Sequence, residues 1–522
     1  LSLFSDSVNA IGNALNISQD EIKTFVERDI RNNIVFKLSD IVSNNLKKIR
    51  TIAKLPAWDV LYKGNSIGKV VVVENLYDFK GGAEGPVILI ASKATGEEEI
   101  PFGVRQIILK REMPHLSHLG VRTRQDQIPF AICEDDEIFK YLQTLNGSVI
   151  SINTLAEEFL INTSINPAEY NNSLTTGAIT KYKDKEGPKP LRLKQSLQEL
   201  PWVITSNDYK HGVVNRKSQE LRTLQKTWLN HEFRIPQSVA IPEGTAELVL
   251  TDQINTTIYN EYKRLIATLN SIDNTKEALQ ELRSIIRQLK APSGFKESFI
   301  NQLQKENIKW DGDWESAWSA IKGVWASKWN YSAYLSREQR GMPHDHLLLA
   351  VLIQPVQKAV YSGVIHTCEP VNNDNNRIVF ELVYGNAEIL VSGSEGTPMR
   401  AHINKKTGQT EIKSLSSLSV GLFTAEDGII ARSDSNGEDL DNYAGAGLYS
   451  SIRSIELLKR YVNNNDPIVT DKVFRNEIFS LIQGLAIAVE NIKGDKRDIE
   501  YIIIKDEVTG KHEIVIVQDR PM

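Results

Sequence analysis

Apolar and polar positions alternate along this chain in several distinct patterns, and the first two predict different structures. Residues 1–53 place apolar side chains at helical spacing, with Ser18 and Glu21 set as a capping box, so we expect a helical segment here. Residues 54–156 carry short β-branched runs separated by turns and helical pieces, which is typical of a compact α/β domain. These runs are "GKVVVVENL", "GPVILIAS", "VRQIILK", "IPFAIC" and "GSVISI".

The rest of the chain predicts a linker and a second, larger domain. Residues 157–200 contain "NPAEYNNS" and "KDKEGPKP", which offer little to bury, so we expect an exposed flexible linker. Residues 201–522 show helical periodicity at 253–289 and 310–335, followed by apolar runs such as "RIVFELVYG" and "DIEYIIIK". We expect a large α+β domain here. A long linker would let the smaller domain travel.

Tryptophans form a stripe in the helical part of the larger domain. Trp310, Trp314 and Trp318 lie at i, i+4 and i+8, with Trp325 and Trp329 beyond, so most can share one helical face. Such a stripe can stack sugar rings, but a buried amphipathic face is the more common use. We interpret the stripe as core.

Composition narrows the class of protein. With 61 basic and 66 acidic residues the net charge is −5, which gives no basic footprint for nucleic acid. Two cysteines, Cys133 and Cys368, exclude a disulfide framework and favour a reducing intracellular compartment. The longest fully apolar run, 347–353, is too short to span a bilayer. The chain begins with leucine and no signal-like segment follows, so we expect a fragment or processed form.

The stretch "MPHLSHLGVRTRQ" holds the strongest candidate for chemistry. Ser117 is a good N-cap, which makes His118 the first residue of a short helix. A phosphoryl group on His118 would lie beside free backbone N–H groups and the positive end of the helix dipole. Arg122 or Arg124 could neutralise its remaining charge. His115 precedes the cap and gains none of this.

Two basic residues are candidates for binding phosphate. Arg432 stands at the end of the apolar "GIIA", directly before a segment rich in Ser, Asp, Asn and Gly. The run "GIIARSDS" predicts a strand, and the polar segment after Arg432 predicts a tight surface loop, with the guanidinium offered to an anion. Lys217 precedes a predicted helix and could contact phosphate as a point charge.

Polar residues in two later strands suggest a site for a hard cation. Glu500 and Gln518 would lie on adjacent strands of one sheet, where their oxygens could hold Mg2+ near nucleotide phosphates. Arg520 could reach the same phosphates. Glu381 lies near Gly385, where a glycine turn could approach a nucleotide. Each of these features is weak alone, because cross-strand polar pairs are common in sheets.

Together these residues resemble one family, the α-glucan, water dikinases with the related phosphoglucan, water dikinases. The wider group includes pyruvate, phosphate dikinase and phosphoenolpyruvate synthase. The resemblance covers almost the whole chain. It rests on "PHLSHLGVRTRQ", "VWASKWN", "VLIQ", "GLF", "RSDSNGEDLDNYAGAGLY" and "VQDRP". The run from 432 to 449 is the longest and most specific of these.

The resemblance implies a multidomain α/β protein. A swivelling α/β phosphohistidine domain (54–156) would be linked to an ATP-grasp α+β nucleotide-binding domain (201–522), after an N-terminal helical segment. The implied reaction passes the β-phosphate of ATP through a phosphohistidine to a glucosyl residue of starch-like glucan such as amylopectin. The γ-phosphate goes to water, which leaves AMP and phosphate. Mg2+ is the implied cofactor and ATP the co-substrate.

The resemblance also assigns roles to residues of this chain. His118 would be catalytic, with Ser117, Arg122 and Arg124 supporting the phosphohistidine; ATP would be bound by Lys217, Gln354, Glu381, Arg432 and Arg520; and the metal would be held by Glu500 and Gln518.

The chain also departs from the family pattern at several positions. Asn215 replaces a glycine before Lys217, and "GNAE" at 385–388 replaces "GLGE", with Tyr384 in place of an arginine. Only Cys133 remains where plant enzymes carry a redox-active cysteine pair, so we expect no disulfide switch. The histidine segment looks more like the phosphoglucan enzymes and the nucleotide part more like the glucan enzymes, which leaves C6 and C3 phosphorylation both open.

Two alternatives remain. A dikinase that makes phosphoenolpyruvate would need a further barrel domain, and an inactive glucan-associated protein would not need the candidate site residues. We expect an intracellular protein, in the cytoplasm or a plastid, at polyglucan granules, with no nucleic-acid or membrane partner.

Overall fold

The computed structural model divides the chain into two units, Leu1–Ala57 and Trp58–Met522. It describes residues 11–15, 17, 18, 22, 45, 48, 49 and 52; residues 56–165 except 80, 82–84, 97, 102, 111, 112, 156 and 157; and residues 200–522 except 228–232, 270–274, 389, 391–397, 416–419, 425, 439–444, 446, 463 and 464. In the first unit residues 11–14, 22, 45, 48, 49 and 52 are helical, and residues 15, 17 and 18 are not. Glu21 of the capping box lies outside the described residues.

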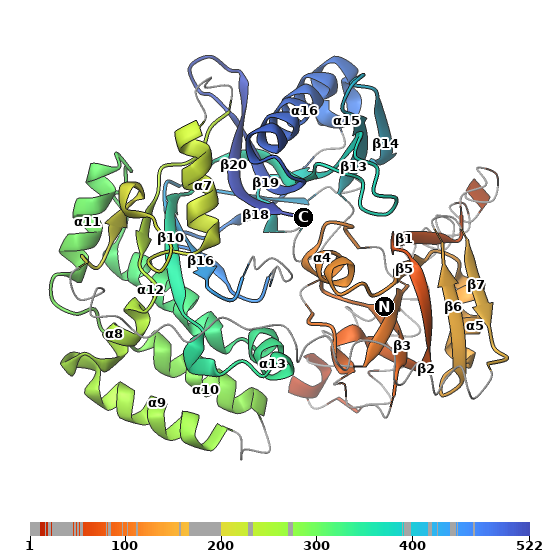
Figure 1. The fold of residues 1–522 in the computed structure, drawn as a ribbon, viewed down its shortest axis with the longest axis horizontal. Helices are drawn as coiled ribbons and strands as arrows, with labels where there is room; N and C mark the ends of the chain where they lie inside the picture. Colours follow the sequence, from red (N-terminus) through yellow and green to blue (C-terminus); the bar gives the residue numbers. More distant parts are fainter. Residues whose placement is uncertain are drawn as a thin grey trace. The chain divides into compact units, whose positions relative to one another are not determined.

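The second unit begins with a seven-stranded sheet in the order β1-β5-β4-β3-β2-β6-β7 (Figure 1). Its strands are β1 (Trp58–Tyr62), β2 (Gly64–Asn75), β3 (Val87–Lys93), β4 (Val104–Leu109), β5 (Phe130–Cys133), β6 (Val149–Thr154) and β7 (Phe159–Asn162). Strands β2 to β5 pair in parallel in the order β2-β3-β4-β5. The first five residues of β3 are all buried, which explains its continuous apolar run.

Three short helices accompany this sheet. They are η2 (Leu76–Asp78), α4 (His118–Gln125) and α5 (Asp136–Thr144). All five predicted β-branched runs form strands, β2 to β6. Strand β7 corrects the expected linker, because it lies inside 157–200 and pairs with β6. It is four residues long with no fully buried position, so its apolar pattern is weak, and its Phe159 ring stacks on Trp58 at 3.8 Å. Residues 166–199 lie outside the described part.

A five-stranded sheet in the order β17-β16-β10-β9-β8 follows, with helices against it. The strands are β8 (Ile204–Thr205), β9 (Val239–Ile241), β10 (Leu349–Pro355), β16 (Ile429–Ser435) and β17 (Ser451–Arg453). The helices are α7 (Arg216–Thr227), α8 (Thr245–Thr251), α9 (Thr256–Thr268), α10 (Thr275–Arg287), α11 (Phe295–Lys305), α12 (Trp314–Ala326) and α13 (Tyr331–Arg340). Short 3-10 turns are η4 (Ser206–Asp208), η5 (Gln253–Asn255), η7 (Ser327–Trp329) and η8 (His344–His346).

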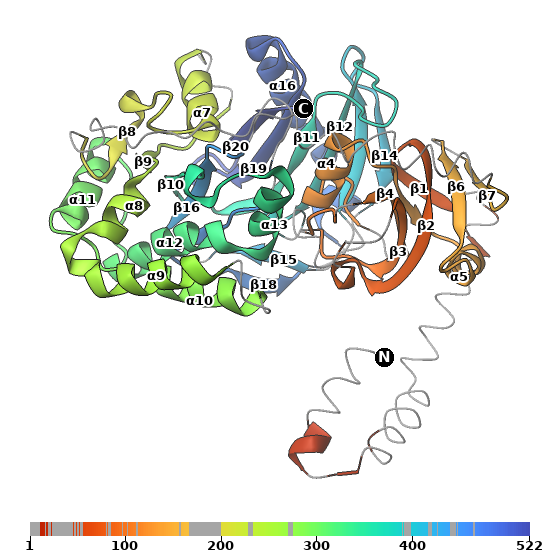
Figure 2. The ribbon, with the colours of Figure 1, turned by 60° about the horizontal axis from the view of Figure 1, so that its bottom comes forward.

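The tryptophan stripe belongs to the core under this sheet. Helices α9, α10 and α12 lie on one side of β10 and β16 (Figure 2). Trp318, Trp325 and Trp329 are buried in that cluster, and Trp310 and Trp314 pack against it. The interpretation of the stripe as core is therefore confirmed.

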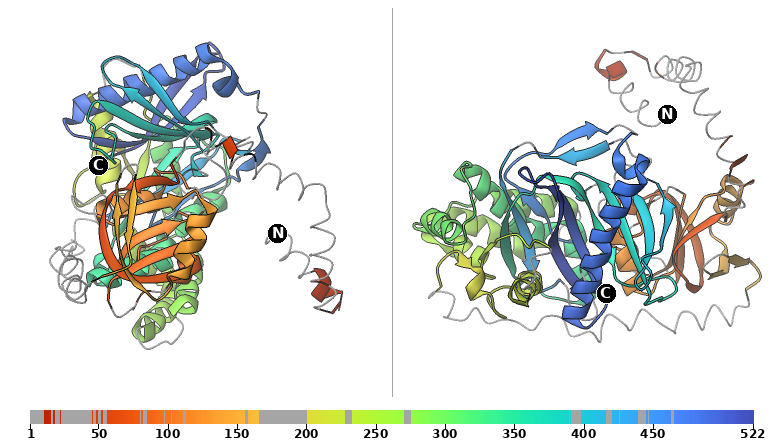
Figure 3. Two further views of the ribbon diagram at one scale, coloured as in Figure 1. Left: turned by 90° about the vertical axis from the view of Figure 1, so that its right-hand side faces the viewer. Right: turned by 90° about the horizontal axis from the view of Figure 1, so that it is seen from above.

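The third sheet has six antiparallel strands in the order β14-β13-β12-β11-β19-β20. They are β11 (Ala359–His366), β12 (Arg377–Tyr384), β13 (Met399–Asn404), β14 (Thr410–Ser414), β19 (Arg497–Lys505) and β20 (His512–Pro521). Helix α16 (Lys472–Lys493), preceded by α15 (Pro467–Thr470), lies across one face of the sheet (Figure 3). Asp471 caps the start of α16, and Gly494, with φ +78°, ends it. A separate ribbon pairs β15 (Val420–Phe423) with β18 (Leu458–Tyr461).

None of the described helices is both long enough and apolar enough to cross a bilayer.

Candidate active site

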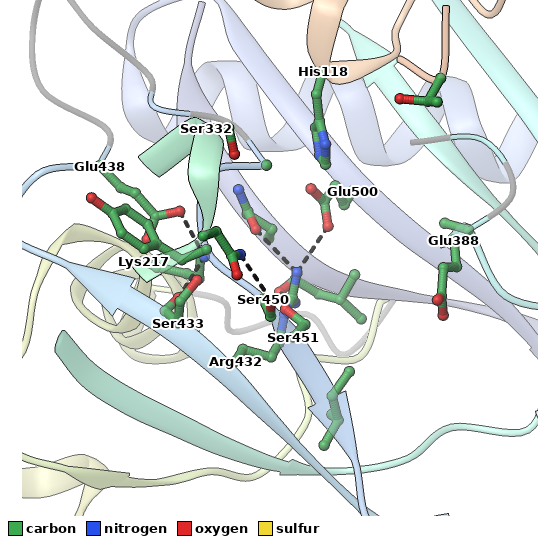
Figure 4. Close-up of a pocket in the computed structure, with 18 of the residues that line it drawn as sticks. His118, Lys217, Ser332, Glu388, Arg432, Ser433, Glu438, Ser450, Ser451 and Glu500 are labelled. Carbon is green, nitrogen blue, oxygen red and sulfur yellow. Dashed lines mark hydrogen bonds and ion pairs between the residues drawn. The ribbon is translucent and has the colours of Figure 1, made fainter. Parts of the chain in front are cut away.

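A cavity of about 880 Å³ gathers most of the candidate residues in one place. His118 points into it from α4, while Arg432 and Lys217 approach from the other side and Glu500 lies between (Figure 4). The sequence-predicted residues that line the cavity are His118, Lys217, Gln354, Arg432, Glu500, Gln518 and Arg520. They come from the first, second and third sheets and their helices, so the fold joins segments up to about 400 positions apart.

Local sequence sets the position of His118. Ser117 is the N-cap of α4, with φ −62° and ψ 160°, and its Oγ accepts a hydrogen bond from Gly120 N at 3.4 Å. His118 is therefore the first helical residue, as the sequence predicted. Its Nδ1 is buried with no hydrogen-bond partner among the described residues, and Gly447 lies so close that a β-carbon there would overlap the ring. Nε2 is then the ring nitrogen available to the cavity.

The charge state of His118 suits a nucleophile. Burial, with the positive charges of Arg122, Arg520 and Lys217, lowers the pKa of the imidazole to about 3. The ring is thus neutral near pH 7, and its free nitrogen lone pair can attack an electrophile.

Arg122 and Arg124 have partners within the histidine segment. Arg122 Nη1 donates to the Glu98 carbonyl at 2.6 Å and lies 3.4 Å from Glu99 Oε2. Arg124 Nη1 donates to the His115 carbonyl at 2.9 Å. Neither arginine is among the described residues that line the cavity. Their contact with a phosphoryl group remains a prediction, and in this arrangement they order the loop before α4.

Lys217 is held at the start of α7 by a neighbouring strand. Its Nζ donates to the Ser433 carbonyl at 2.6 Å and lies 3.8 Å from Glu438 Oε1. Asp434 of β16 accepts the backbone N–H groups of Asn215 at 3.0 Å and Lys217 at 3.1 Å. The Asn215 side chain also donates to the Asp434 carbonyl at 2.9 Å. Asn215 therefore ties down the loop that precedes Lys217.

Arg432 lies in strand β16, as the run "GIIARSDS" predicted, and not in the polar loop expected after it. Strand β16 continues through Ser435 and pairs with β10 along its length. The side chain is buried, and its Nη2 donates to Glu500 Oε2 at 2.9 Å and to Gln518 Oε1 at 3.0 Å, while Nη1 donates to the Val517 carbonyl. The turn expected after Arg432 begins only past Ser435.

Glu500 and Gln518 face each other as predicted. They are direct partners in the β19–β20 pair, and both line the cavity. Arg520 lines it too, and its Nε donates to Asp498 Oδ2 at 2.9 Å. Within the described part of the chain, no group of three or more His, Cys, Asp or Glu side chains is placed to hold a metal alone. A cation at Glu500 and Gln518 would therefore take its other oxygens from water and substrate.

The remaining two ATP-binding expectations have different outcomes. Gln354 of β10 lines the cavity, and its buried Nε2 has no partner among the described residues, so it can donate to a ligand. Glu381 does not line the described cavity: its carboxylate accepts the backbone N–H groups of His115 and Leu116. The position of Glu381 therefore argues against the predicted ATP contact. It points to the histidine loop and not to the Gly385 turn.

The residues near Gly385 that differ from the family pattern also fall into two groups, those that line the cavity and one that does not. Asn386 and Ala387 line the cavity, whereas Tyr384 is buried in the core of the third sheet. The cavity also contains residues that sequence reasoning missed. These include Tyr77, Glu98, Glu99, Glu438 and Gly447. Glu438 and Gly447 belong to the run 432–449, whereas no local motif marks Tyr77, Glu98 and Glu99, which only the folded arrangement brings to the cavity.

Comparison with known protein families agrees with this geometry. Residues 57–170 match the phosphohistidine-like domain of alpha-glucan water dikinase, and residues 293–522 match the AMP/ATP-binding domain of pyruvate phosphate dikinase. The chain therefore has a phosphohistidine-like domain and an AMP/ATP-binding domain of the dikinase family.

Curated relatives refine the likeness. An alpha-glucan water dikinase, chloroplastic, of Solanum tuberosum is 34% identical over 99% of this chain and 35% of its own length. Alpha-glucan water dikinase 2 of Arabidopsis thaliana is 34% identical over 100% of this chain and 40% of its own length. A phosphoenolpyruvate synthase of Aeropyrum pernix is 25% identical over 53% of this chain. Within the dikinases the chain thus resembles the alpha-glucan water dikinases along its whole length, and spans well under half of those proteins.

Proposed function

We propose that this chain carries out the α-glucan, water dikinase reaction, with His118 as the phosphoryl carrier. The observation that supports this most directly is the shared cavity, where a neutral imidazole faces Lys217, Arg432 and Arg520. Three cations around one nucleophile suit a polyphosphate and little else of that size.

In the first step the lone pair of Nε2 attacks the β-phosphorus of ATP. A P–N bond forms, the P–O bond to AMP breaks, and AMP leaves with that electron pair. Water then attacks the γ-phosphorus of the pyrophosphoryl group on His118, the bond from the bridging oxygen to the γ-phosphorus breaks, and orthophosphate leaves, so that the β-phosphoryl group stays on His118. Phosphoryl transfer depends on positioning and on neutralising charge, and Lys217, Arg432 and Arg520 can do both. The free N–H groups of the first turn of α4 favour the dianionic product on His118.

Mg2+ fits beside these cations. Glu500 and Gln518 offer two hard oxygen atoms, and Mg2+ usually takes one or two protein oxygens together with water and phosphate oxygens. When bound, the ion would supply charge for the phosphates. Arg432 would then still orient both side chains through its Nη2 hydrogen bonds.

The nucleotide part supports an ATP-grasp arrangement, because residues of the second and third sheets together line the cavity. Transfer to a polymer requires a further movement. A cavity of about 880 Å³ is of the size that encloses one nucleotide, whereas the glucan is a polymer. We therefore propose that the phosphohistidine domain swivels to meet the glucan, and that the chain between β7 and about residue 200 forms the connection. The chain would act at polyglucan granules, in a plastid or the cytoplasm; the position phosphorylated, C6 or C3, is left open.

Product analysis tests this function. Purified chain with ATP and Mg2+ should release AMP and phosphate in equal amounts, and amylopectin or glycogen should increase both and gain one phosphate per AMP. His118→Ala should abolish all three products. Formation of ADP alone, or AMP release that responds to pyruvate and not to glucan, would refute the proposal.

A further inference from the structure

The loop before α4 is held by a buried carboxylate of the third sheet. Glu381 lies in the middle of β12 and is only 1% exposed. Its Oε1 accepts the His115 N–H at 2.9 Å, and its Oε2 accepts the Leu116 N–H at 3.0 Å. Each oxygen thus holds one backbone amide, two and three residues before His118. Such charge-assisted bonds are short and directional.

A second contact lies directly beside the first. His115 Nε2 lies 2.7 Å from Asp59 Oδ2, and the same oxygen is 3.2 Å from Arg400 Nη2. Arg400 is the strand partner of Glu381 in the β12–β13 pair, so both groups present one surface to the loop. Arg124 completes the arrangement by donating to the His115 carbonyl. His115 is therefore held by its N–H, its carbonyl and its ring.

A third contact joins η2 of the phosphohistidine domain to α10 and α13. Lys276 Nζ of α10 lies 4.0 Å from the centroid of the Tyr77 ring and 4.9 Å from that of Tyr331. Leu116 adds a small apolar contact with Val364 and Val383. The contacts named here, all between described residues, are mostly polar, together with one small apolar cluster.

Polar contacts of this kind suit reversible docking. A carboxylate is costly to bury unless it is hydrogen-bonded, so Glu381 favours the docked loop. Once the loop leaves, water can solvate both the carboxylate and the amides, so separation does not leave a large apolar surface exposed. A large apolar interface would instead hold the two parts together permanently.

We propose that Glu381 is a docking residue that fixes residues 115 and 116 so that His118 faces the nucleotide. It positions His118 and does not contact ATP. This inference rests on the proposed function, because docking matters only if His118 must both approach ATP and leave it. Removal of the bidentate contact should slow labelling of His118 by about tenfold or more, since small misplacement of a nucleophile has large effects on rate.

The test compares Glu381→Gln with Glu411→Gln, a control on an exposed part of the same sheet. Three quantities are measured: the ATP dissociation constant by calorimetry, the single-turnover rate of His118 labelling from β-labelled ATP, and a distance between two spin labels. The labels go on cysteines introduced at the exposed positions Tyr141 and Val508; the native cysteines are buried. Glu381→Gln should leave ATP affinity unchanged, slow labelling and increase the population of long distances. Glu411→Gln should change none of them.

Other outcomes would overturn the inference. Wild-type labelling with an unchanged distance distribution would show that Glu381 does not dock the loop. Weaker ATP binding with an unchanged distance would make Glu381 an ATP ligand. If wild-type protein is not labelled at all, the proposed function fails, but the distance measurement still decides whether Glu381 docks the loop. If Glu381→Gln does not fold, Asp59→Asn is measured in the same way, and an unchanged distance there would count equally against docking.

Discussion

Arg432→Ala should remove both an electrostatic contact for phosphate and a structural link between two sheets. The guanidinium lies in β16 of the second sheet, and its hydrogen-bond acceptors, Glu500, Gln518 and the Val517 carbonyl, belong to the third. Alanine leaves all three without this donor. Because Glu500 has a side chain only 16% exposed, its carboxylate would lose its cation in a largely buried place.

The expected effects follow from those contacts. Removing one partner of a buried ion pair costs about 3–5 kcal/mol, and the partial exposure of Glu500 favours the lower end, about 3 kcal/mol. At ~2–4 °C per kcal/mol, the melting temperature should fall by about 6–12 °C. Loss of one charged contact to a reacting phosphate should slow labelling of His118 by about 10²–10³-fold.

Two variants separate the structural effect from the chemical one. Arg432→Lys keeps the charge but has no planar fork, so it cannot hold Glu500 and Gln518 together in the same geometry. We expect a smaller fall in melting temperature for lysine than for alanine, yet strongly slowed labelling in both. Labelling is measured with β-labelled ATP well below either melting temperature, and melting by scanning fluorimetry. Near wild-type labelling of Arg432→Ala would refute the placement of the triphosphate; unchanged melting would refute the structural link.

Four further predictions concern the surroundings of His118 and the cysteines. Because the pKa of His118 is lowered to about 3 from 6.5, its neutral form persists on acidification, and the labelling rate should not fall between pH 7 and pH 5 through protonation of this ring; a decline with a midpoint near pH 6.5 that is traced to His118 would contradict this. Below about pH 6.5 His118 is protonated in the unfolded chain but stays neutral in the folded chain, which lowers the free energy of unfolding as the pH falls. This free energy should therefore decrease less steeply on acidification in His118→Ala than in wild type. Gly447→Ala should slow labelling at least about tenfold without loss of ATP binding, because φ is +70° and the new β-carbon would overlap the His118 ring; an unchanged rate would show that the ring can shift freely. Cys133 and Cys368 are free and buried, and burial raises the pKa of both thiols, to about 11 for Cys133, so oxidants should leave the initial labelling rate unchanged; reversible inactivation by oxidised glutathione would contradict the absence of a redox switch.

Sequence alone predicted the features that depend on neighbouring residues. The strands of the first sheet were recognisable because parallel strands buried on both faces have long β-branched runs. Ser117 and the start of α4 were predictable since an N-cap acts on residues within one turn. The sequence also predicted that Glu500 and Gln518 lie on neighbouring strands, because a short hairpin joins these two strands.

Features that depend on distant residues were missed. The strand "GIIARSDS" was predicted, but the contacts of Asp434 were not, because its backbone amide partners lie more than 200 positions away. Glu381 was assigned to ATP from its place near a glycine turn, whereas its partners lie 265 and 266 residues earlier. Strand β7 was too short to be recognised without its pairing to β6.

The central claim is that His118 carries the phosphoryl group and that His115 does not. Only His118 lies in the first turn of α4 and lines the cavity with Lys217, Arg432 and Arg520; His115 is bound to Asp59 outside the described cavity. The most direct measurement is labelling of His118→Ala and His115→Ala side by side with ATP radioactive at the β position. We predict that acid-labile label disappears from His118→Ala and is largely retained by His115→Ala. Label that persists on His118→Ala and vanishes from His115→Ala would contradict the account.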